Sequence, residues 1–255
     1  MHRKPAGLLV IFVWMLVPAV TFGMPPRILI LTGENNHDWR ATTPVLQHLL
    51  EADGRFAVDV TTNVPELRPD IFARYDALLS NFNTYGQQHP GPVWDAAMRE
   101  AFEKFIRSGH GFVVVHAGSA VFYDWPAFQE IAGATWGKGT SHGRMHTNEI
   151  HILSAGGPIT DGLKDFQTFD EFWQNAPVSP GTVPLATVTP KPEFGGSGNP
   201  EPVAFMTHYG QGRGFTLLLG HDTHGMASPG FQSLLCRGAE WAATGKVSPE
   251  NHPLK

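Results

Sequence analysis

Cysteine is almost absent from this sequence of 255 residues, in which Cys236 is the single example. A lone cysteine cannot form a disulfide within its own chain, so the fold has to depend on a hydrophobic core. Cys236 lies in FQSLLCRGAEWAAT, where the apolar residues have the spacing of an amphipathic helix. We therefore expect Cys236 to be a small core residue and not a catalytic thiol.

Several sequence motifs with a known chemistry are missing as well. No Gly-x-Gly-x-x-Gly follows the first predicted strand, and no serine stands in a Gly-x-Ser-x-Gly frame. The segment GQGRG at 210–214 is rich in glycine but opens no predicted helix, so we expect no phosphate cradle there. The net charge is −5 and no basic stripe is present, which argues against nucleic acid as a partner.

The first 23 residues differ from the rest of the chain. The positively charged start MHRK precedes an apolar run, GLLVIFVWMLVPAV, which has the length of the apolar part of a signal peptide. This run is shorter than the roughly 20 residues that span a bilayer, which favours cleavage over an uncleaved anchor. We predict a signal peptide over 1–23 and one domain over 24–255. The mature protein would then be periplasmic or extracellular, with no stable membrane anchor.

Strand and helix patterns alternate through the first half of the mature chain. Short apolar strands are predicted at 27–32, 56–62, 75–83 and 111–116, and helices are predicted between and after them. Such alternation predicts right-handed crossovers and a parallel sheet. Further on, PVAFMTHY and GFTLLLG are joined by GQGR, which is typical of a β-hairpin.

The stretch FVVVHAGSA at 112–120 contains the first candidate for chemistry. A buried strand ends at His116, and small residues follow, as in an elbow that presents one side chain before a helix. Ligands of parallel sheets bind at the carboxyl ends of the strands. His116 could therefore be a general base or a metal ligand; the alternative is a histidine that satisfies backbone groups of the loop.

Other polar residues follow predicted strands or lie in loops. His221 follows the apolar strand in LLLGHDTHG, and His37 lies in GENNHDWR, where the adjacent Asp38 could instead cap a helix. In FDEFW, either Glu171 or Asp170 could reach the cleft as an acid, a base or a partner of a histidine, and we favour Glu171.

The segment GKGTSHGRMHTNEIHI adds three histidines. His142 and His146 are four residues apart, but the glycine and threonine content argues against a helix and hence against a metalloprotease-type motif. His151 lies in an alternating strand and is expected to be structural. The sequence leaves open whether His142 or His146 faces the cleft.

Taken together, several segments resemble the ThuA-like (trehalose utilisation) family of the class I glutamine amidotransferase-like superfamily. They cover nearly all of the mature chain in the order of the family: ILILTGENNHDWR, GHGFVVVHAGSAVFYDWPAFQEIAGATW, PITDGLKDFQTFDEFW, PVAFMTHYGQGRGFTLLLGHD and FQSLLCRGAEWAATG. The resemblance implies an α/β fold, a flavodoxin-like three-layer sandwich with a mostly parallel central sheet and an added β-hairpin.

The resemblance also implies a function. In the related amidotransferases the elbow residue is a cysteine, whereas His116 stands there in this chain. An imidazole cannot replace the thiolate in an acyl-enzyme cycle, so amidotransferase activity is excluded, but it can take a proton or bind a metal. The family context implies catabolism of disaccharides or glycosides, in which an oxidoreductase first makes a 3-keto sugar.

We therefore predict a small-molecule carbohydrate substrate and lyase, hydrolase or isomerase chemistry, with His37, His116, Glu171 and His221 meeting in one cleft as acid–base groups. A divalent metal could be held there, with candidate ligands His37, His116, His142 and His221. Trp39, Tyr85 and Trp173 could stack on a sugar, although core packing is the alternative for Trp173. Two other functions stay open: a non-catalytic carbohydrate-binding protein, and a metal-dependent hydrolase of another substrate.

Overall fold

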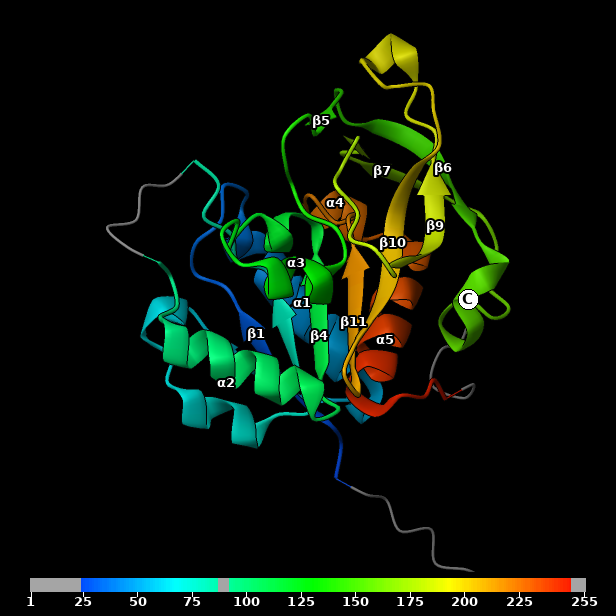
Figure 1. Ribbon diagram of the computed structural model, residues 1–255. Helices are drawn as coiled ribbons and strands as arrows, with labels where there is room; N and C mark the ends of the chain where they lie inside the picture. The colour runs from blue at the N-terminus through cyan, green and yellow to red at the C-terminus, as the bar shows by residue number, and fades with distance from the viewer. Residues whose placement is uncertain (1–23, 87–91, 249–255) are drawn as a thin grey trace, which may run out of the picture.

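The computed structural model of this protein describes residues 24–86 and 92–248. The predicted signal peptide lies outside the described residues. The described chain forms a nine-stranded sheet in the order β2-β1-β3-β4-β11-β10-β9-β6-β7, together with a two-stranded sheet, β5-β8 (Figure 1).

One half of the large sheet is parallel, as the alternation of strands and helices predicts. It consists of β1 (Arg27–Leu31), β2 (Ala57–Thr61), β3 (Ala77–Ser80), β4 (Gly111–Val115) and β11 (Gly212–Leu217). Because these strands run in the same direction, their carboxyl ends lie along one edge, where His37, His116 and His221 follow β1, β4 and β11.

The other half of the sheet is antiparallel. It contains β10 (Glu201–Tyr209), β9 (Val183–Val188), β6 (His146–Ile152) and β7 (Phe166–Asp170). The predicted hairpin is β10–β11, whose register pairs Tyr209 with Gly212 across a tight turn. The extension is larger than this hairpin alone, since β9, β6 and β7 continue the sheet beyond β10.

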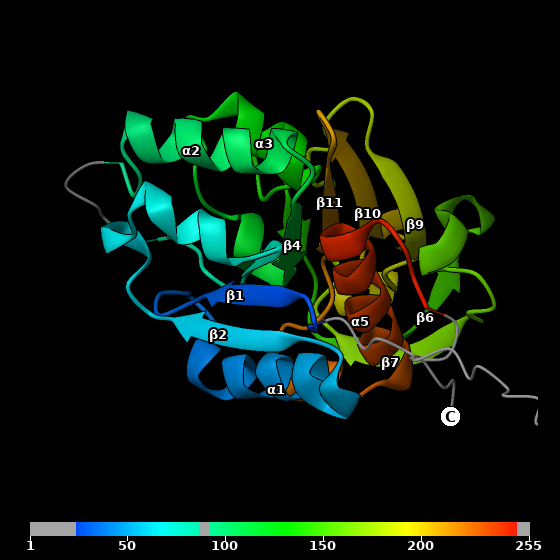
Figure 2. The same ribbon diagram turned by 90° about the horizontal axis from the view of Figure 1, so that it is seen from below.

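Helices cover both faces of the sheet (Figure 2). α1 (Trp39–Glu51) and α5 (Pro229–Thr244) lie on one face, and α2 (Ala96–Arg107) and α3 (Pro126–Ala132) lie on the other. The predicted flavodoxin-like sandwich is therefore confirmed. The remaining described elements are short: β5 (Ser141–His142), β8 (Trp173–Gln174), α4 (Thr223–Met226), η1 (Ala52–Gly54), η2 (Val64–Glu66), η3 (Pro69–Arg74), η4 (His116–Ser119), η5 (Ser154–Ile159) and η6 (Pro192–Phe194).

Alternate residues of each central strand face opposite helical layers. In β1, Ile28 and Ile30 join the core under α1 and α5, whereas Leu29 and Leu31 join the core under α2 and α3. Cys236 is buried on α5, with its sulfur 3.5 Å from the carbonyl oxygen of Leu49. Its predicted place in the core is confirmed. Within 24–86 and 92–248, no helix combines the length and apolar character needed to cross a membrane.

Asp38 caps a helix, which is the role that the sequence allows for it. Its carboxylate accepts a hydrogen bond of 3.1 Å from the backbone N–H of Ala41, in the first turn of α1. This bond satisfies an N–H group that the helix itself leaves without a partner. The cap fixes the start of α1 directly after His37 and so helps to hold that loop at the carboxyl edge of the sheet.

The core under α2 is dominated by aromatic rings around Phe102, which is fully buried. Ring centroids of five aromatic side chains lie between 5.2 and 6.4 Å from that of Phe102: Phe72, Trp94, Phe112, Trp125 and Phe128. Phe102→Ala would leave a cavity among them, and we expect it to lower the free energy of unfolding by about 3–5 kcal/mol. Urea unfolding measures this change. Phe102→Leu is the control and should cost clearly less, and equal losses for the two variants would contradict the cavity explanation.

Candidate active site

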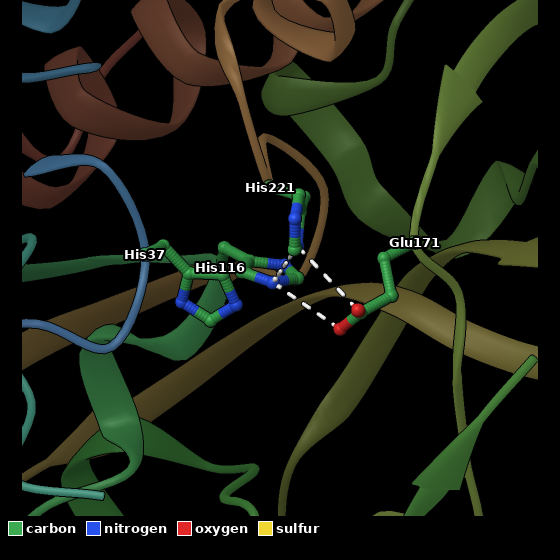
Figure 3. A group of neighbouring side chains, drawn as sticks. All are labelled: His37, His116, Glu171 and His221. Carbon is green, nitrogen blue, oxygen red and sulfur yellow. Dashed lines mark hydrogen bonds and ion pairs between the residues drawn. The ribbon is translucent and has the colours of Figure 1, made fainter. Parts of the chain in front are cut away.

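Four side chains predicted from separate parts of the sequence converge at the carboxyl edge of the parallel strands. His37, His116, Glu171 and His221 each offer one nitrogen or oxygen atom, and these atoms all lie within 4.8 Å of one another. Figure 3 shows the four side chains pointing toward a common centre from four different segments. The predicted convergence is therefore found, while the catalytic role of the four residues stays a prediction.

His116 begins η4 directly after β4 and forms a strained elbow there. Its φ of 46° lies in the left-handed region, which a residue with a side chain rarely adopts. Gly118 allows the tight turn that follows, because a Cβ there would stand 2.2 Å from the carbonyl oxygen of Ser80. The Ser80 hydroxyl donates to the Gly118 carbonyl at 2.7 Å. The backbone thus has the elbow form that the sequence predicts.

The hydrogen bonds of His116 fix which ring nitrogen faces the cluster. Nδ1 lies 2.8 Å from the carbonyl oxygen of Leu218, an acceptor, so Nδ1 carries the proton. In the neutral ring Nε2 therefore offers its lone pair to the cluster, 3.3 Å from Nδ1 of His221 and 3.6 Å from Oε1 of Glu171. His116 is 3% exposed, so it lies beneath the floor of the site.

His37 is oriented in a similar way by an asparagine. The side-chain oxygen of Asn35 accepts from Nδ1 of His37 at 2.9 Å, from the His37 backbone N–H at 2.9 Å and from Nδ2 of Asn83 at 2.6 Å. Nε2 of His37 is left for the cluster. Burial, followed by the charges of His116 and His221, lowers the pKa of His37 to about 3, so the ring is neutral near pH 7.

Glu171 is the carboxylate of the site. Burial alone would raise its pKa, but hydrogen bonds and charges from His116 and His221 outweigh burial and lower it well below the usual range. Its oxygens also meet Nδ1 of His142 at 3.2 Å and the indole N–H of Trp173 at 3.3 Å. The negative charge of the ionised Glu171 therefore favours positive charge on the surrounding imidazoles.

His221 also contacts the Glu171 carboxylate. Its Nδ1 lies 3.5 Å from Oε2 of Glu171. Burial lowers the pKa of His221, but the hydrogen bond and charge of Glu171, with the charges of Asp170 and Asp222, outweigh this effect and raise it. His221 thus favours the protonated form more than an ordinary histidine does, whereas His37 favours the neutral form.

Asp170, the other carboxylate of FDEFW, does not reach the cleft. It is fully buried, and it accepts backbone N–H bonds from Glu171 at 2.9 Å, Gly220 at 2.7 Å and His221 at 3.1 Å. Burial raises the pKa of Asp170, and the charge of His116 and these three N–H groups oppose that rise. Asp170 fixes the backbone that carries Glu171 and His221.

The cluster opens into a cavity of about 400 Å³ with an aromatic wall. Tyr85, Trp136 and Trp173 line it, and the Trp136 ring lies 5.7 Å from Tyr85 and 5.0 Å from Trp173 in edge-to-face contacts. The lining also contains the residues Asn36, His37, Asp38, Ala117, Ala120, His142, Glu171, His221 and Asp222. Of the described cluster residues, only His116 is absent from this lining, which agrees with its place beneath the floor.

The surroundings of the three histidines between residues 142 and 151 show which of them lines the cavity. His142 lines the cavity, whereas His146 is buried and stacks on Phe194 at 4.5 Å. His142 was a candidate metal ligand, but it lies beside Glu171 and outside the group of four converging atoms that the described residues form. His151 pairs with Asp165 at 2.9 Å, consistent with its expected structural role.

Sequence reasoning missed two residues of the site and placed one wrongly. Trp136 stands in a glycine-rich loop with no strand or helix pattern around it, so nothing in the sequence marks it as cavity-lining. Asn35 lies in the polar loop GENNHDWR, but its bond to His37 depends on the turn of that loop. Trp39 begins α1 and does not belong to the described cavity lining; the guanidinium of Arg40 lies 4.2 Å from its ring.

The four converging atoms suit a divalent cation in their chemistry. Three imidazole nitrogens and one carboxylate oxygen are donors that zinc, iron, manganese or cobalt accept. In known metal sites a ligating histidine donates its other N–H to a carbonyl or a similar acceptor, which fixes the ring. His116 does so to Leu218 and His37 to Asn35. The residues therefore fit a metal centre.

Comparisons with known proteins agree with this fold. A family model described as trehalose utilisation (ThuA) matches residues 27–242, which supports a carbohydrate-related role. A ThuA-like protein from Parabacteroides merdae is 29% identical, with a TM-score of 0.78 over 88% of this chain and 92% of that chain. A ThuA-like protein from Bacteroides uniformis is 19% identical, with a TM-score of 0.62 over 91% and 97% of the two chains, and it shows the fold alone. No curated protein is a significant match.

The lowered pKa of His37 predicts how the stability of the metal-free protein depends on pH. Between about 3 and 6.5 the unfolded chain binds a proton that the folded chain does not, so this group makes the free energy of unfolding decrease as pH falls. Between pH 7 and pH 5, the free energy of unfolding should therefore decrease less in His37→Asn than in the unmodified protein. We expect the difference to be about 1 kcal/mol, allowing for solvent screening. Urea unfolding at both pH values measures it. An unchanged pH dependence in the variant would contradict the assignment of a neutral His37.

Proposed function

This chain belongs to the ThuA (trehalose utilisation) family, and on that premise we propose that it is an exported enzyme acting on an oxidised glycoside, a sugar with a ketone at C3. The observation that carries the proposal is the meeting of histidines and one ionised carboxylate beside an aromatic-walled cavity at the ligand-binding edge of the sheet. Export is supported by the apolar run that follows the charged start of the sequence.

A ketone at C3 makes the neighbouring hydrogen at C2 acidic. A base removes that proton, the electron pair forms a double bond between C2 and C1, and the C1–O bond to the leaving group breaks. The departing oxygen takes a proton from an acid, so that an unsaturated keto sugar and an alcohol result. Such an elimination needs a base, an acid and a group that stabilises negative charge on the ketone oxygen.

The base that we propose is His142 with Glu171 behind it. Nδ1 of His142 lies 3.2 Å from Oε2 of Glu171, and it also lies 2.9 Å from the carbonyl oxygen of Gly143. Because both neighbours are acceptors, Nδ1 carries the proton and Nε2 is left to accept one from the substrate. Both residues line the cavity. This assignment adds His142 to the acid–base residues expected from the sequence.

In the protein without a bound cation, the acid that we propose is His221. Its raised pKa favours the protonated form, and the ring lines the same cavity as His142 and Glu171. His37, with a pKa of about 3, is neutral and cannot serve as an acid near pH 7. We propose instead that His37 binds a divalent cation, together with His116, which lies beneath the cavity floor.

A divalent cation held by His37, His116, Glu171 and His221 would supply positive charge that stabilises a negatively charged substrate oxygen. His221 would then be a ligand and not the acid, and the departing oxygen would take the proton that His142 had removed. The two fixed tautomers support this reading, because His37 and His116 both aim a lone pair at the common centre. The place of His116, out of contact with the cavity, favours a ligand over a base that touches substrate.

A non-catalytic carbohydrate-binding protein is the second candidate. The observation that favours it is the wall of Tyr85, Trp136 and Trp173, since aromatic faces and edges bind sugars without any chemistry. Turnover separates the two functions, because a binding protein retains its ligand unchanged.

Turnover of 3-keto-glucosides, including 3-keto-trehalose, is the test of the proposed function. We expect His116→Ala and Glu171→Gln each to lower kcat/KM by roughly 100-fold or more, since each removes a group on which the acid–base chemistry depends. His208→Ala is the control, because His208 is exposed on β10 and lies outside the cavity lining. Binding without turnover by the unmodified protein would favour the second candidate.

Metal binding has its own measurement. Calorimetric titration of chelator-treated protein with Zn²⁺ or Mn²⁺ should give one site, and His221→Ala should weaken it by roughly 100-fold, since one of four ligands is lost. His142→Ala is the matched variant. It removes a neighbouring imidazole outside the group of four, so affinity should stay within about threefold while turnover is lost. Equal weakening by both variants would contradict the assignment of ligands.

A further inference from the structure

A second cavity adjoins the first and shares two of its residues. It encloses about 600 Å³ and is lined by residues that include Gly143, Arg144, Glu193 and Phe194. His142 and Glu171 line both cavities, so the proposed base and its carboxylate stand at the junction. Nothing in the proposed chemistry of one sugar ring requires this second space.

The wall of the second cavity is held in place by several contacts. The backbone N–H of Arg144 donates to the carbonyl of Phe194 at 2.7 Å, and its Nη2 donates to the carbonyl of Glu193 at 3.1 Å. The guanidinium carbon lies 5.5 Å from the centre of the Phe194 ring, which in turn stacks on His146 at 4.5 Å and 2°. These contacts hold the planar guanidinium of Arg144 at the cavity, although the residue is exposed. The guanidinium has N–H groups other than the one that donates to Glu193, and these can donate to a ligand.

The charges of the two cavities argue against an anionic ligand. The carboxylates that line them belong to Asp38, Glu171, Glu193 and Asp222, and Arg144 is the only lysine or arginine in the described lining. A phosphate or carboxylate in the second cavity would find its one guanidinium already offset by the Glu193 carboxylate. Sugar hydroxyls carry no charge and accept hydrogen bonds from a guanidinium, so they suit the same surroundings.

We propose that the second cavity binds the leaving-group ring of an uncharged, unphosphorylated two-ring glycoside. One ring lies against Tyr85, Trp136 and Trp173, the other lies at Arg144, and the bond between the rings crosses the junction at His142 and Glu171. The inference rests on the proposed function for its chemistry, but it concerns binding and can be measured without turnover. Arg144 determines specificity for the second ring.

Calorimetric titration with trehalose, methyl α-glucoside and trehalose 6-phosphate tests the assignment. Arg144→Ala should weaken trehalose binding by roughly 10-fold and change binding of methyl α-glucoside by less than about twofold, since only trehalose has a second ring. Trehalose 6-phosphate should bind at least about 10-fold more weakly than trehalose, and Glu193→Gln should narrow that gap by removing one negative charge. Arg107→Ala is the matched control. It removes an arginine that lies 4.5 Å from the Tyr209 ring at the end of α2, away from the described cavity linings.

The same variants in a turnover assay separate this inference from the proposed function. With 3-keto-trehalose and methyl 3-keto-glucoside as substrates, Arg144→Ala should raise KM for the two-ring substrate alone. Turnover in which Arg144→Ala affects both substrates equally would overturn the second-ring site and leave the proposed function standing. Trehalose binding that depends on Arg144, without any turnover, would support the second-ring site and overturn the proposed function. Tighter binding of the phosphorylated sugar, or neither binding nor turnover of any of these sugars, would overturn the inference.

Discussion

The geometry of the site depends on one buried carboxylate, that of Asp170. It accepts backbone N–H bonds from Glu171, next to it in the chain, and from Gly220 and His221, fifty residues further on. These bonds join the end of β7, in the antiparallel half of the sheet, to the loop after β11, in the parallel half. Because bonds to backbone leave the side chains of Glu171 and His221 unoccupied, both can turn toward the cavity. A buried carboxyl group that accepts several backbone N–H bonds holds the segments that donate them in fixed positions.

The histidines are held by neighbours that also select their tautomers. The carbonyl of Leu218 binds Nδ1 of His116, and the side-chain oxygen of Asn35 binds Nδ1 of His37. Both rings consequently aim Nε2 at the common centre. The left-handed φ of His116 is the strained part of this arrangement, and burial of the elbow maintains it. Burial lowers the pKa of both His37 and His221, but of these two only His221 forms a hydrogen bond with the Glu171 carboxylate, and its pKa is raised in consequence.

The antiparallel extension determines the shape of the ligand-binding space. Without it, the carboxyl edge of the parallel strands would carry His37, His116 and His221 but no carboxylate at the centre, since Glu171 follows β7. The segments beside the extension also carry Trp173, Arg144 and η6, which form walls of the two cavities. Figure 1 shows β6, β7 and β9 near the upper end of the parallel strands. The parallel half thus supplies imidazoles and most of the lining of the first cavity, and the extension supplies the carboxylate and the lining of the second cavity.

The sequence by itself determined the α/β class, the parallel half and the elbow at His116, because strand and helix periods and apolar runs are local properties of the chain. It also placed His37, His116 and His221 at one edge, since parallel strands end together. Tertiary structure alone decided between Glu171 and Asp170, which are adjacent in sequence and face different surroundings. It likewise decided between His142 and His146, and it brought Trp136 and Arg144 to the cavities. These outcomes depend on contacts between segments far apart in the chain, such as that of Asp170 with Gly220, and no local pattern of residues encodes which side chain such a contact leaves exposed to a ligand.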